Sequence, residues 1–223
     1  ASIGGINLIG GANPIFGLNT LGGALSITTK DGFTHTGNQF ESYGGSFERI
    51  VNTIESGGNN DKWGYYITAN YFDEDGWRDA SPSDAYTIFS AASFRHGDTT
   101  LDITLNHADT NLIGNGSSPI ELLALDRAAV FTSPDITENK MTMINFSGTQ
   151  WLKQTIQLSG NIFYRKNKTN SFNGDGSEFE DDGAGELAED GDDVEDQNGN
   201  GISSTNANGT SRDAINNISN REQ

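Results

Sequence analysis

Carboxylates are concentrated in one stretch of the chain, 173–196, which contains no lysine or arginine. Its twelve acidic residues are Asp175, Glu178, Glu180, Asp181, Asp182, Glu186, Glu189, Asp190, Asp192, Asp193, Glu195 and Asp196. Residues 196–201, DQNGNG, fit the start of a calcium-binding loop, in which alternate oxygens and a glycine at the sixth place let the chain wrap a hard cation. The twelfth place is Ala207, so the bidentate carboxylate is missing. We interpret the stretch as a solvated, self-repelling loop, with weak calcium binding helped by Asp192 or Asp193 as the alternative.

The other residue types that commonly do chemistry lack a catalytic spacing. His35, His96 and His107 form no HExxH-type pair, and the chain has no GxSxG, GxxxxGK or strand-following GxGxxG motif. Cysteine is absent, which excludes disulfides, thiolate metal sites and a cysteine nucleophile. The formal net charge of -18 argues against nucleic-acid binding, because phosphate neutralisation needs clustered lysine and arginine. We predict a protein that is not an enzyme, with no catalytic, cofactor-binding or metal-binding residue to name.

Composition favours a β protein. The chain has 28 glycines and only 33% apolar residues, which suits short strands and many turns. No apolar run approaches the roughly 18 residues of a membrane-spanning helix, so a helical membrane protein is excluded. The N-terminus has no basic start followed by an apolar segment, which is the form of a secretory signal. We therefore expect a fragment that lacks both ends of the natural chain.

Alternation of apolar and polar residues predicts strands, and it is clearest over 63–71. Trp63, Tyr65, Ile67, Ala69 and Tyr71 share one face, and Gly64, Tyr66, Thr68 and Asn70 share the other. Aromatic rings flank an aliphatic centre on the first face, which is the pattern of a lipid-facing barrel strand. Further segments with this character are 39–45, 47–55, 86–95, 100–106, 141–150 and 156–165. The sequence therefore predicts an all-β, antiparallel transmembrane barrel segment of about seven strands.

The connections between these strands alternate in length. The short ones are 57–62, 96–98 and 152–154, and the long ones are 73–84, 112–137 and the residues from 173 to the end. Outer-membrane barrels have this alternation, with tight periplasmic turns and long extracellular loops. Residues 118–121, SPIE, fit a capping box with proline at the first helical position, which predicts a short helix continuing to Ala129 that packs the second long loop.

Several residues near the outer strand ends are candidates for ligand contact. They are the aromatic residues Tyr71, Phe72 and Trp77 and the carboxylates Asp73, Glu74 and Asp75. Anchoring at the membrane interface is the simpler explanation for the rings, so none is assigned as a site.

The segment 13–30, NPIFGLNTLGGALSITTK, resembles the closing stretch of the plug of TonB-dependent outer-membrane receptors. In that family a Pro-aromatic-Gly-x-Asn element and a Gly-Gly pair lead into an apolar strand that ends in Thr-Lys. The stretches DGF (31–33), GNQFESYGGSFERI (37–50) and YYITANYFDEDGWRD (65–79) look like this family too. The resemblance implies that residues 1–30 are the C-terminal end of a plug domain. It also implies that 36–223 are the N-terminal part of a barrel of about 22 strands, with extracellular loops near 73–84, 112–137 and 173–220.

The resemblance also implies a function, which is energised uptake of a scarce nutrient across the bacterial outer membrane. The nutrient would be a ferric siderophore, cobalamin or an oligosaccharide, bound between the outer loops and the plug. The expected partners are outer-membrane lipid, this nutrient, and a TonB-type energy-coupling protein that pulls on a missing N-terminal segment. Because a seven-stranded sheet leaves two unpaired edges, we also expect that the chain does not insert stably alone.

The alternative is a soluble, calcium-dependent extracellular β adhesin or carbohydrate-binding module, suggested by the Asp/Asn/Gly-rich tail and the negative charge. The two hypotheses differ in where the aromatic face of 63–71 lies. A soluble module buries Trp63, Tyr65, Ile67 and Tyr71 in its core, whereas a membrane receptor exposes them.

Overall fold

The chain folds almost entirely into antiparallel β structure. A computed structural model describes residues 2–11, 22–176, 180–181, 184, 186–189, 192–193, 198–203 and 214–222. Its main sheet has the order β13-β9-β8-β7-β6-β5-β4-β3. The strands are β3 (Gly37–Gly44), β4 (Ile50–Asn59), β5 (Trp63–Glu74), β6 (Ser83–His96), β7 (Thr99–Gly114), β8 (Asp135–Lys153), β9 (Ile156–Gly176) and β13 (Ala214–Glu222). The prediction of an all-β, antiparallel chain is confirmed, and β3 to β9 form the predicted run of about seven consecutive strands.

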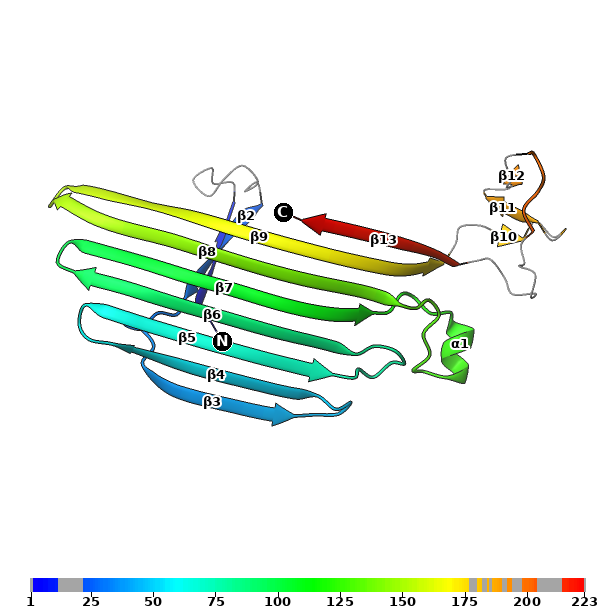
Figure 1. The fold of residues 1–223 in the computed structure, drawn as a ribbon, viewed down its shortest axis with the longest axis horizontal. Helices are drawn as coiled ribbons and strands as arrows, with labels where there is room; N and C mark the ends of the chain where they lie inside the picture. Colours follow the sequence, from blue (N-terminus) through cyan, green and yellow to red (C-terminus); the bar gives the residue numbers. More distant parts are fainter. Residues whose placement is uncertain are drawn as a thin grey trace.

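The two ends of this sheet differ, as Figure 1 shows. At one end the strands are joined by short turns at 60–62, 97–98 and 154–155. At the other end they are joined by longer loops, of which 75–82 and 115–134 are the longest in the described part of β3 to β9. We call these the short-turn end and the loop end. The predicted alternation of short and long connections is therefore present.

A short helix, α1 (Ile120–Leu125), lies in the loop 115–134, as predicted, but it is shorter than expected. Pro119 is the N-cap residue, and no side chain caps the helix. The predicted capping box is therefore wrong, because the Ser118 hydroxyl is used elsewhere. It donates to the carbonyl oxygen of Ala129 at 3.5 Å and accepts from Arg78 at 3.4 Å. No helix among the described residues is long and apolar enough to cross a bilayer.

A separate hairpin precedes the sheet. It pairs β1 (Ile3–Gly10) with β2 (Gly23–Thr29), and it crosses behind the sheet in Figure 1. The strand that was predicted after the Gly-Gly pair is β2. Gly23 has φ +140° and a Cβ there would lie 2.6 Å from the carbonyl oxygen of Ile9, so this position requires glycine. The start of the plug-like motif, 13–21, lies outside the described residues.

The acidic stretch contributes more strand than its sequence indicates. β9 extends to Gly176, and β13 pairs with residues 168–176 of β9, so both enter the interval that was predicted to be a loop. The sequence of β13, AINNISNRE, lacks apolar alternation, and its pairing rests on backbone hydrogen bonds. A small sheet of β10 (Glu180–Asp181), β11 (Leu187–Glu189) and β12 (Asp192–Asp193) lies between β9 and β13 in the chain.

The two faces of the main sheet differ in exposure. On β5 the side chains of Trp63, Tyr65, Ile67 and Tyr71 are 60, 52, 45 and 44% exposed. Between them, Tyr66 and Thr68 point to the opposite face and are 2 and 4% exposed. We call the first face the outer face and the second the inner face. Tyr66, Phe89 and Ala91 form a small buried cluster on the inner face.

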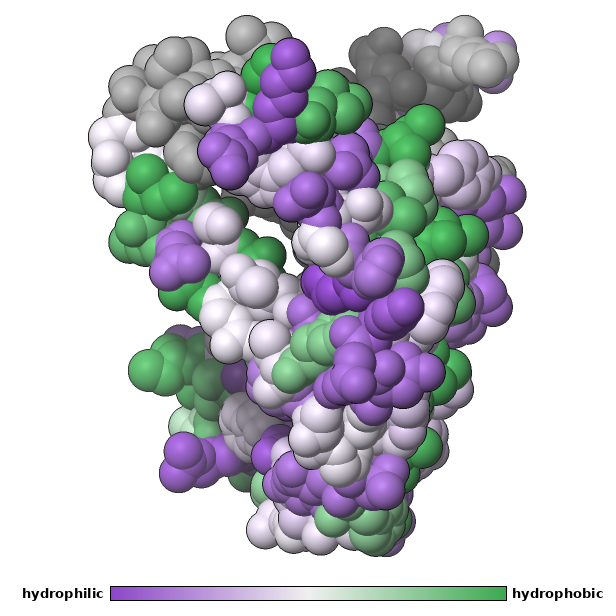
Figure 2. All heavy atoms as spheres, turned by 90° about the vertical axis from the view of Figure 1, so that its left-hand side faces the viewer, coloured by the Kyte–Doolittle hydropathy of each residue, from purple (hydrophilic) through white to green (hydrophobic). Residues whose placement is uncertain are grey.

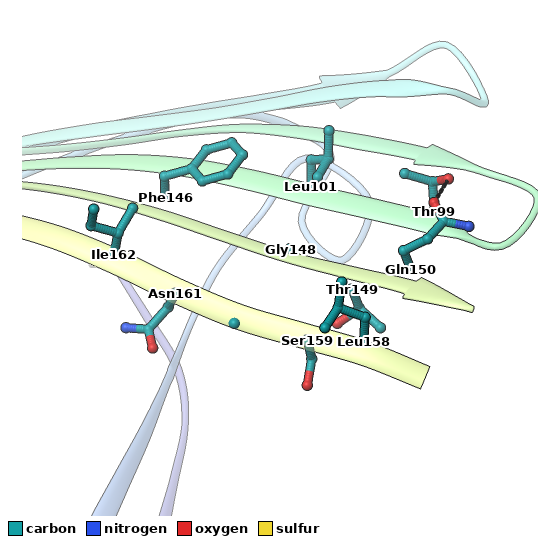
Figure 3. Close-up of a pocket in the computed structure, with 11 residues that line it drawn as sticks. Thr99, Leu101, Phe146, Gly148, Thr149, Gln150, Leu158, Ser159, Asn161 and Ile162 are labelled. Carbon is teal, nitrogen blue, oxygen red and sulfur yellow. Dashed lines mark hydrogen bonds between the residues drawn. The ribbon is translucent and has the colours of Figure 1, made fainter. Parts of the chain in front are cut away.

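The same alternation continues across the neighbouring strands. One ladder row of the outer face consists of Tyr65, Ala92, Ile103, Phe146 and Ile162. A groove lies in this face near the short-turn end (Figure 3). Viewed from the short-turn end, most of the surface is hydrophilic or close to neutral (Figure 2). The apolar side chains are therefore concentrated on the flank of the sheet rather than at the end that carries the turns.

Candidate functional site

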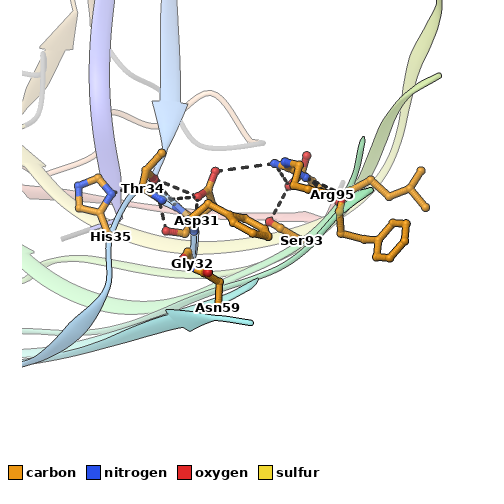
Figure 4. Close-up of polar contacts among 11 residues, drawn as sticks. Asp31, Gly32, Thr34, His35, Asn59, Ser93 and Arg95 are labelled. Carbon is orange, nitrogen blue, oxygen red and sulfur yellow. Dashed lines mark hydrogen bonds and ion pairs between the residues drawn. The ribbon is translucent and has the colours of Figure 1, made fainter. Parts of the chain in front are cut away.

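A tight turn, 30–36, connects β2 to β3 and lies against the inner face at the short-turn end (Figure 4). Asp31 organises it, because one carboxylate oxygen accepts hydrogen bonds from the backbone N–H of Phe33 at 2.8 Å and of Thr34 at 2.9 Å. The Thr34 hydroxyl donates to the same oxygen at 3.0 Å. An aspartate that accepts from the backbone two and three residues later is a strong turn former. The sequence DGFTH therefore specifies a preformed turn, which we call the docked turn.

Arg95 on β6 holds the docked turn electrostatically. Its guanidinium donates to Asp102 at 2.7 Å and lies 3.8 Å from Asp31. It also donates to the backbone carbonyl oxygens of Phe94 at 3.1 Å and Leu101 at 3.0 Å. These contacts fix the planar guanidinium in one orientation, so that Asp31 meets a positive charge that is already in place.

A further contact of this network comes from Ser93, which is 1% exposed and donates to Asp102 at 2.6 Å. The ring of Phe33 lies 5.4 Å from the Arg95 guanidinium carbon, within cation–π range. The docked turn is thus held to β6 by charge, hydrogen bonding and ring packing together.

Glycines allow the docked turn to approach the sheet backbone. A Cβ on Gly32 would collide with the backbone N and O of Tyr65 and with the carbonyl oxygen of Gly58. A Cβ on Gly57 would collide with the carbonyl oxygen of His35, and one on Gly64 would lie 2.8 Å from the Phe33 ring. The positions on both sides of the contact therefore require the absence of a side chain.

A second polar cluster holds the start of the turn. Lys30 forms an ion pair with Glu55 on β4 at 2.8 Å, and the hydroxyl of Tyr66 donates to the same carboxylate oxygen at 2.6 Å. The side-chain amide of Asn59 donates to the carbonyl oxygen of Gly32 at 2.9 Å. The buried Tyr66 ring thus serves as a support for an ion pair between the hairpin segment and the sheet.

The surroundings of Asp31 act on its pKa in opposite directions. Partial burial raises the pKa, because it disfavours the charged carboxylate. The hydrogen bonds from Thr34 and Phe33 and the charge of Arg95 lower it, and their combined effect is larger. The net result is a pKa below the ordinary value, so the carboxylate is ionised and available to Arg95 at neutral pH.

The docked turn has the chemistry of a mechanical contact rather than of a catalyst. The Thr34 hydroxyl contacts both Asp31 and Nδ1 of His35 at 3.0 Å, but the carboxylate does not orient the histidine as it does in a catalytic triad. His96 and His107 lie on β6 and β7, and the described residues contain no group of three histidines or carboxylates that could hold a metal. Asp196, Gln197 and Ala207 of the predicted calcium loop lie outside the described residues.

A second candidate site lies at the loop end. It is a cavity of about 370 Å³ between the loop 75–82 and the helix region, and we call it the loop-end pocket. Its lining consists of Trp77, Arg78, Ile120, Leu123, Ala124 and Arg127. The backbone N–H of Asp79 donates to the carbonyl oxygen of Ala128 at 2.9 Å, which fastens the two loops to each other. The predicted packing role of the helix is consistent with this contact.

Positive charge in the loop-end pocket has no described ionic partner. The Arg78 guanidinium lies 4.9 Å from the Trp77 ring and bonds to a neutral serine, and neither Arg78 nor Arg127 forms an ion pair with a described residue. Sequence reasoning named Trp77 as a candidate for ligand contact but missed the two arginines. They come from different loops, and no local pattern links them.

The other candidates near the outer strand ends do not line this pocket. Glu74 pairs with Arg49 at 2.8 Å, and the backbone N–H of Asp75 donates to the carbonyl oxygen of Phe47 at 2.9 Å. Tyr71 and Phe72 lie on opposite faces of β5. Glu74 is thus held by an ion pair and Asp75 by a backbone hydrogen bond, and of the six candidates only Trp77 lines the pocket.

The sequence matches no protein-family model and no curated protein significantly. The function is therefore inferred from the fold and from the two candidate sites.

Proposed function

We propose that this protein forms part of the wall of an outer-membrane β-barrel receptor, together with the adjoining end of its plug. The receptor takes up a scarce nutrient with energy supplied through a TonB-type partner. The observation that supports this most strongly is the outer face of the sheet, where large apolar side chains are exposed while the most buried residues lie on the opposite face. Soluble β sandwiches have the opposite arrangement, with the apolar face buried.

The apolar band has the extent expected for a bilayer. On β5 and β6 it is bounded by the aromatic pair Trp63 and Phe94 towards the short turns and by Tyr71 and Tyr86 towards the loops. The eight residue steps from Trp63 to Tyr71 correspond to about 27 Å of extended chain. At the usual strand tilt of about 35–45°, this length covers about 20 Å of the apolar band of outer-membrane barrels, which is about 25 Å high and carries aromatic rings at its borders. Exposed patches of this size are unfavourable in water and favourable in lipid.

Barrel closure requires more strands than the eight described here. β3 and β13 are the sheet edges, and unpaired N–H and C=O groups cost several kcal/mol each in hydrocarbon. We therefore propose that the membrane form contains further strands that pair with both edges. On this proposal the short turns face the periplasm and the loops face the outside.

The docked turn has a defined place in this proposal. It joins the hairpin of β1 and β2, which would be the last part of the plug, to the first strand of the wall. Its contacts with Arg95 and Glu55 hold the plug segment against the inner face. The energy-coupling partner would act on plug residues that precede this hairpin.

The loop-end pocket is the proposed point of nutrient contact. Two guanidinium groups that form no ion pair with a described residue, one of them beside an indole ring, favour a ligand that combines negative charge with a flat ring. A ferric siderophore, cobalamin and an oligosaccharide all remain candidate nutrients, and the pocket favours an anionic member of these classes.

The test uses tryptophan fluorescence in micelles of a detergent with brominated alkyl chains. One variant keeps only Trp63 (Trp77→Phe, Trp151→Phe), and its matched control keeps only Trp77 (Trp63→Phe, Trp151→Phe). We expect the bromines to quench Trp63 strongly, because it faces the alkyl chains. Trp77 should instead be quenched by aqueous iodide, because it lies in an exposed loop.

The opposite result would support the soluble alternative. A chain that is monodisperse without detergent, and whose Trp63 is reached by neither quencher, would have this face buried in a water-excluded core. That outcome would overturn the receptor proposal.

A further inference from the structure

The groove in the outer face at the short-turn end is lined mostly by apolar atoms of β7, β8 and β9 (Figure 3). Its cavity volume is about 430 Å³, within the usual range for small-molecule sites. Leu101, Phe146, Leu158 and Ile162 form its walls. We call it the glycine groove, because its floor is formed by Gly148 and Gly160.

The two glycines interrupt a row of large apolar side chains. Ladder partners across the sheet place Trp63, Phe94, Leu101, Gly148 and Gly160 in one row of the outer face. The row begins with two aromatic rings, whose centroids are 4.7 Å apart, and ends with two directly paired glycines. Strands β8 and β9 therefore leave a recess in the outer face, at the level of the aromatic rings of Trp63 and Phe94.

The backbone does not explain the glycine at position 160. Gly148 and Gly160 are not among the glycines with positive φ, and the only register shift between β8 and β9 lies at 151–153. A Cβ on Gly160 would meet nothing within 4 Å, and one on Gly148 would meet only a side-chain carbon of Leu101 below 3 Å. Glycine inside a strand weakens the strand, and it often marks a place where a ligand approaches the backbone closely. Gly160 is thus better explained by what occupies the groove than by the fold.

We propose that the glycine groove binds one acyl chain of a membrane phospholipid. The proposal rests on the proposed function, because it takes the outer face to contact lipid. Phe146 and Ile162 wall the groove on the side nearer the middle of the strands, and apolar walls of this kind suit an alkyl chain. The lipid would be held individually, in contrast to the exchanging lipid around the rest of the wall.

The polarity of the lining gives the lipid an orientation. Thr99 and Gln150 lie on the side of the groove nearer the short turns, and their side chains are hydrogen-bonded at 2.5 Å. Hydroxyl and carboxamide groups suit the ester and headgroup region of a phospholipid. The chain therefore enters the apolar side of the groove, and the headgroup lies beside the short turns, at the level of the Trp63 ring.

The test measures retention of 1-palmitoyl-2-oleoyl phosphatidylethanolamine by native mass spectrometry of the detergent-solubilised full chain. The variant Gly160→Leu fills the groove without a backbone clash, and Gly160→Ala fills it partly. Ser90→Leu is the matched control, because it adds the same side chain to the outer face away from the groove. We expect one retained lipid for the unmodified protein and for Ser90→Leu. Apparent affinity should fall by about tenfold or more in Gly160→Leu, which corresponds to 1.4 kcal/mol or more, and by less in Gly160→Ala.

Two results would overturn the proposal. One is equal retention by the unmodified protein and Gly160→Leu, and the other is an equal loss in Ser90→Leu. Quenching of Trp63 by brominated detergent separates this proposal from the one on which it rests. If the glycine groove binds no lipid while Trp63 is quenched in every variant, only the inference about the groove fails. If Trp63 is not quenched in the unmodified protein, the receptor proposal fails as well.

Discussion

Replacing Gly32 with alanine should lift the docked turn from the inner face. The new Cβ would overlap three backbone atoms, N and O of Tyr65 and O of Gly58, and backbone in the middle of a sheet cannot move aside as a flexible side chain can. Overpacking of this kind costs about 1–3 kcal/mol. Displacement would also break the hydrogen bond from Asn59 to the Gly32 carbonyl, which is worth about 1 kcal/mol. The partly exposed contact between Arg95 and Asp31 adds little, about 0–1 kcal/mol.

The sum is a loss of about 3 kcal/mol in the free energy of docking, which raises the undocked population by about a hundredfold. Hydrogen–deuterium exchange follows this change, because docking packs the backbone at Gly32 against Tyr65 and Gly58 and shields the turn from water. Within the turn, the backbone N–H of His35 donates to the carbonyl oxygen of Asp31 at 3.0 Å. Exchange at 33–35 should accelerate by that factor. Gly160→Ala is the control, since its Cβ meets nothing and a strand gains about 0.5–1 kcal/mol from the change. Unchanged exchange in Gly32→Ala, or equal acceleration in Gly160→Ala, would refute the reasoning.

Three further variants test the two candidate sites, and Lys140→Gln and Arg165→Gln, which lie outside both sites, serve as controls. The pKa of Asp31 is lower in the folded protein than in the unfolded chain, so its contribution to docking should be complete near neutral pH and should be lost as the pH falls below about 4. Hydrogen–deuterium exchange of the docked turn should therefore accelerate at low pH in the unmodified protein. The variant Asp31→Asn should not show this pH dependence. Arg95→Gln should lower the free energy of unfolding by about 1–3 kcal/mol in thermal unfolding, because two carbonyls and a carboxylate lose a charged donor. Removing the exposed ion pair of Lys140 by Lys140→Gln should cost less than about 1 kcal/mol. In a protein whose only tryptophan is Trp77, titration with 1-naphthoate followed by fluorescence measures binding to the loop-end pocket. Binding should be roughly tenfold weaker in Arg127→Gln and unchanged in Arg165→Gln. An equal loss of binding in both variants would count against the pocket.

On the proposed function, the contacts of the docked turn would let a plug segment be held firmly and still be released. Its contacts are a few charged and polar interactions around close backbone packing, rather than a broad apolar interface. Such contacts have steep distance dependence, so a small displacement of the turn removes most of them together. A pulling force on the hairpin would then meet resistance over a short distance only.

The strand pattern was predictable because one rule governs it along the whole chain. Where one face is apolar and the other polar, as on β5 and β7, the period of two fixes both the strand and the orientation of its side chains. β13 was missed, because its sequence has no alternation of apolar and polar residues, and its place is set by pairing with the edge of β9. The helix was found but its cap was not, since the Ser118 hydroxyl bonds to residues from two separate loops.

The candidate sites were less predictable than the strands. The sequence around Asp31 and Gly32 indicates an ordinary turn. No pattern in the neighbouring residues indicates that Gly57, Gly64 and Arg95 contact this turn from the sheet. Arg78 and Arg127 likewise become neighbours only when two loops are fastened together.

The sequence by itself determined the run of strands from β3 to β9, which of their faces is apolar and where the connections between them are short or long, because these depend on neighbours within a few residues. The tertiary structure alone decided that the docked turn meets Gly57, Gly64 and Arg95, and that two glycines from separate strands open a groove. These features depend on the register between strands and on contacts between residues far apart in the chain. Such contacts arise from the packing of the whole sheet, and no local pattern of residues encodes them.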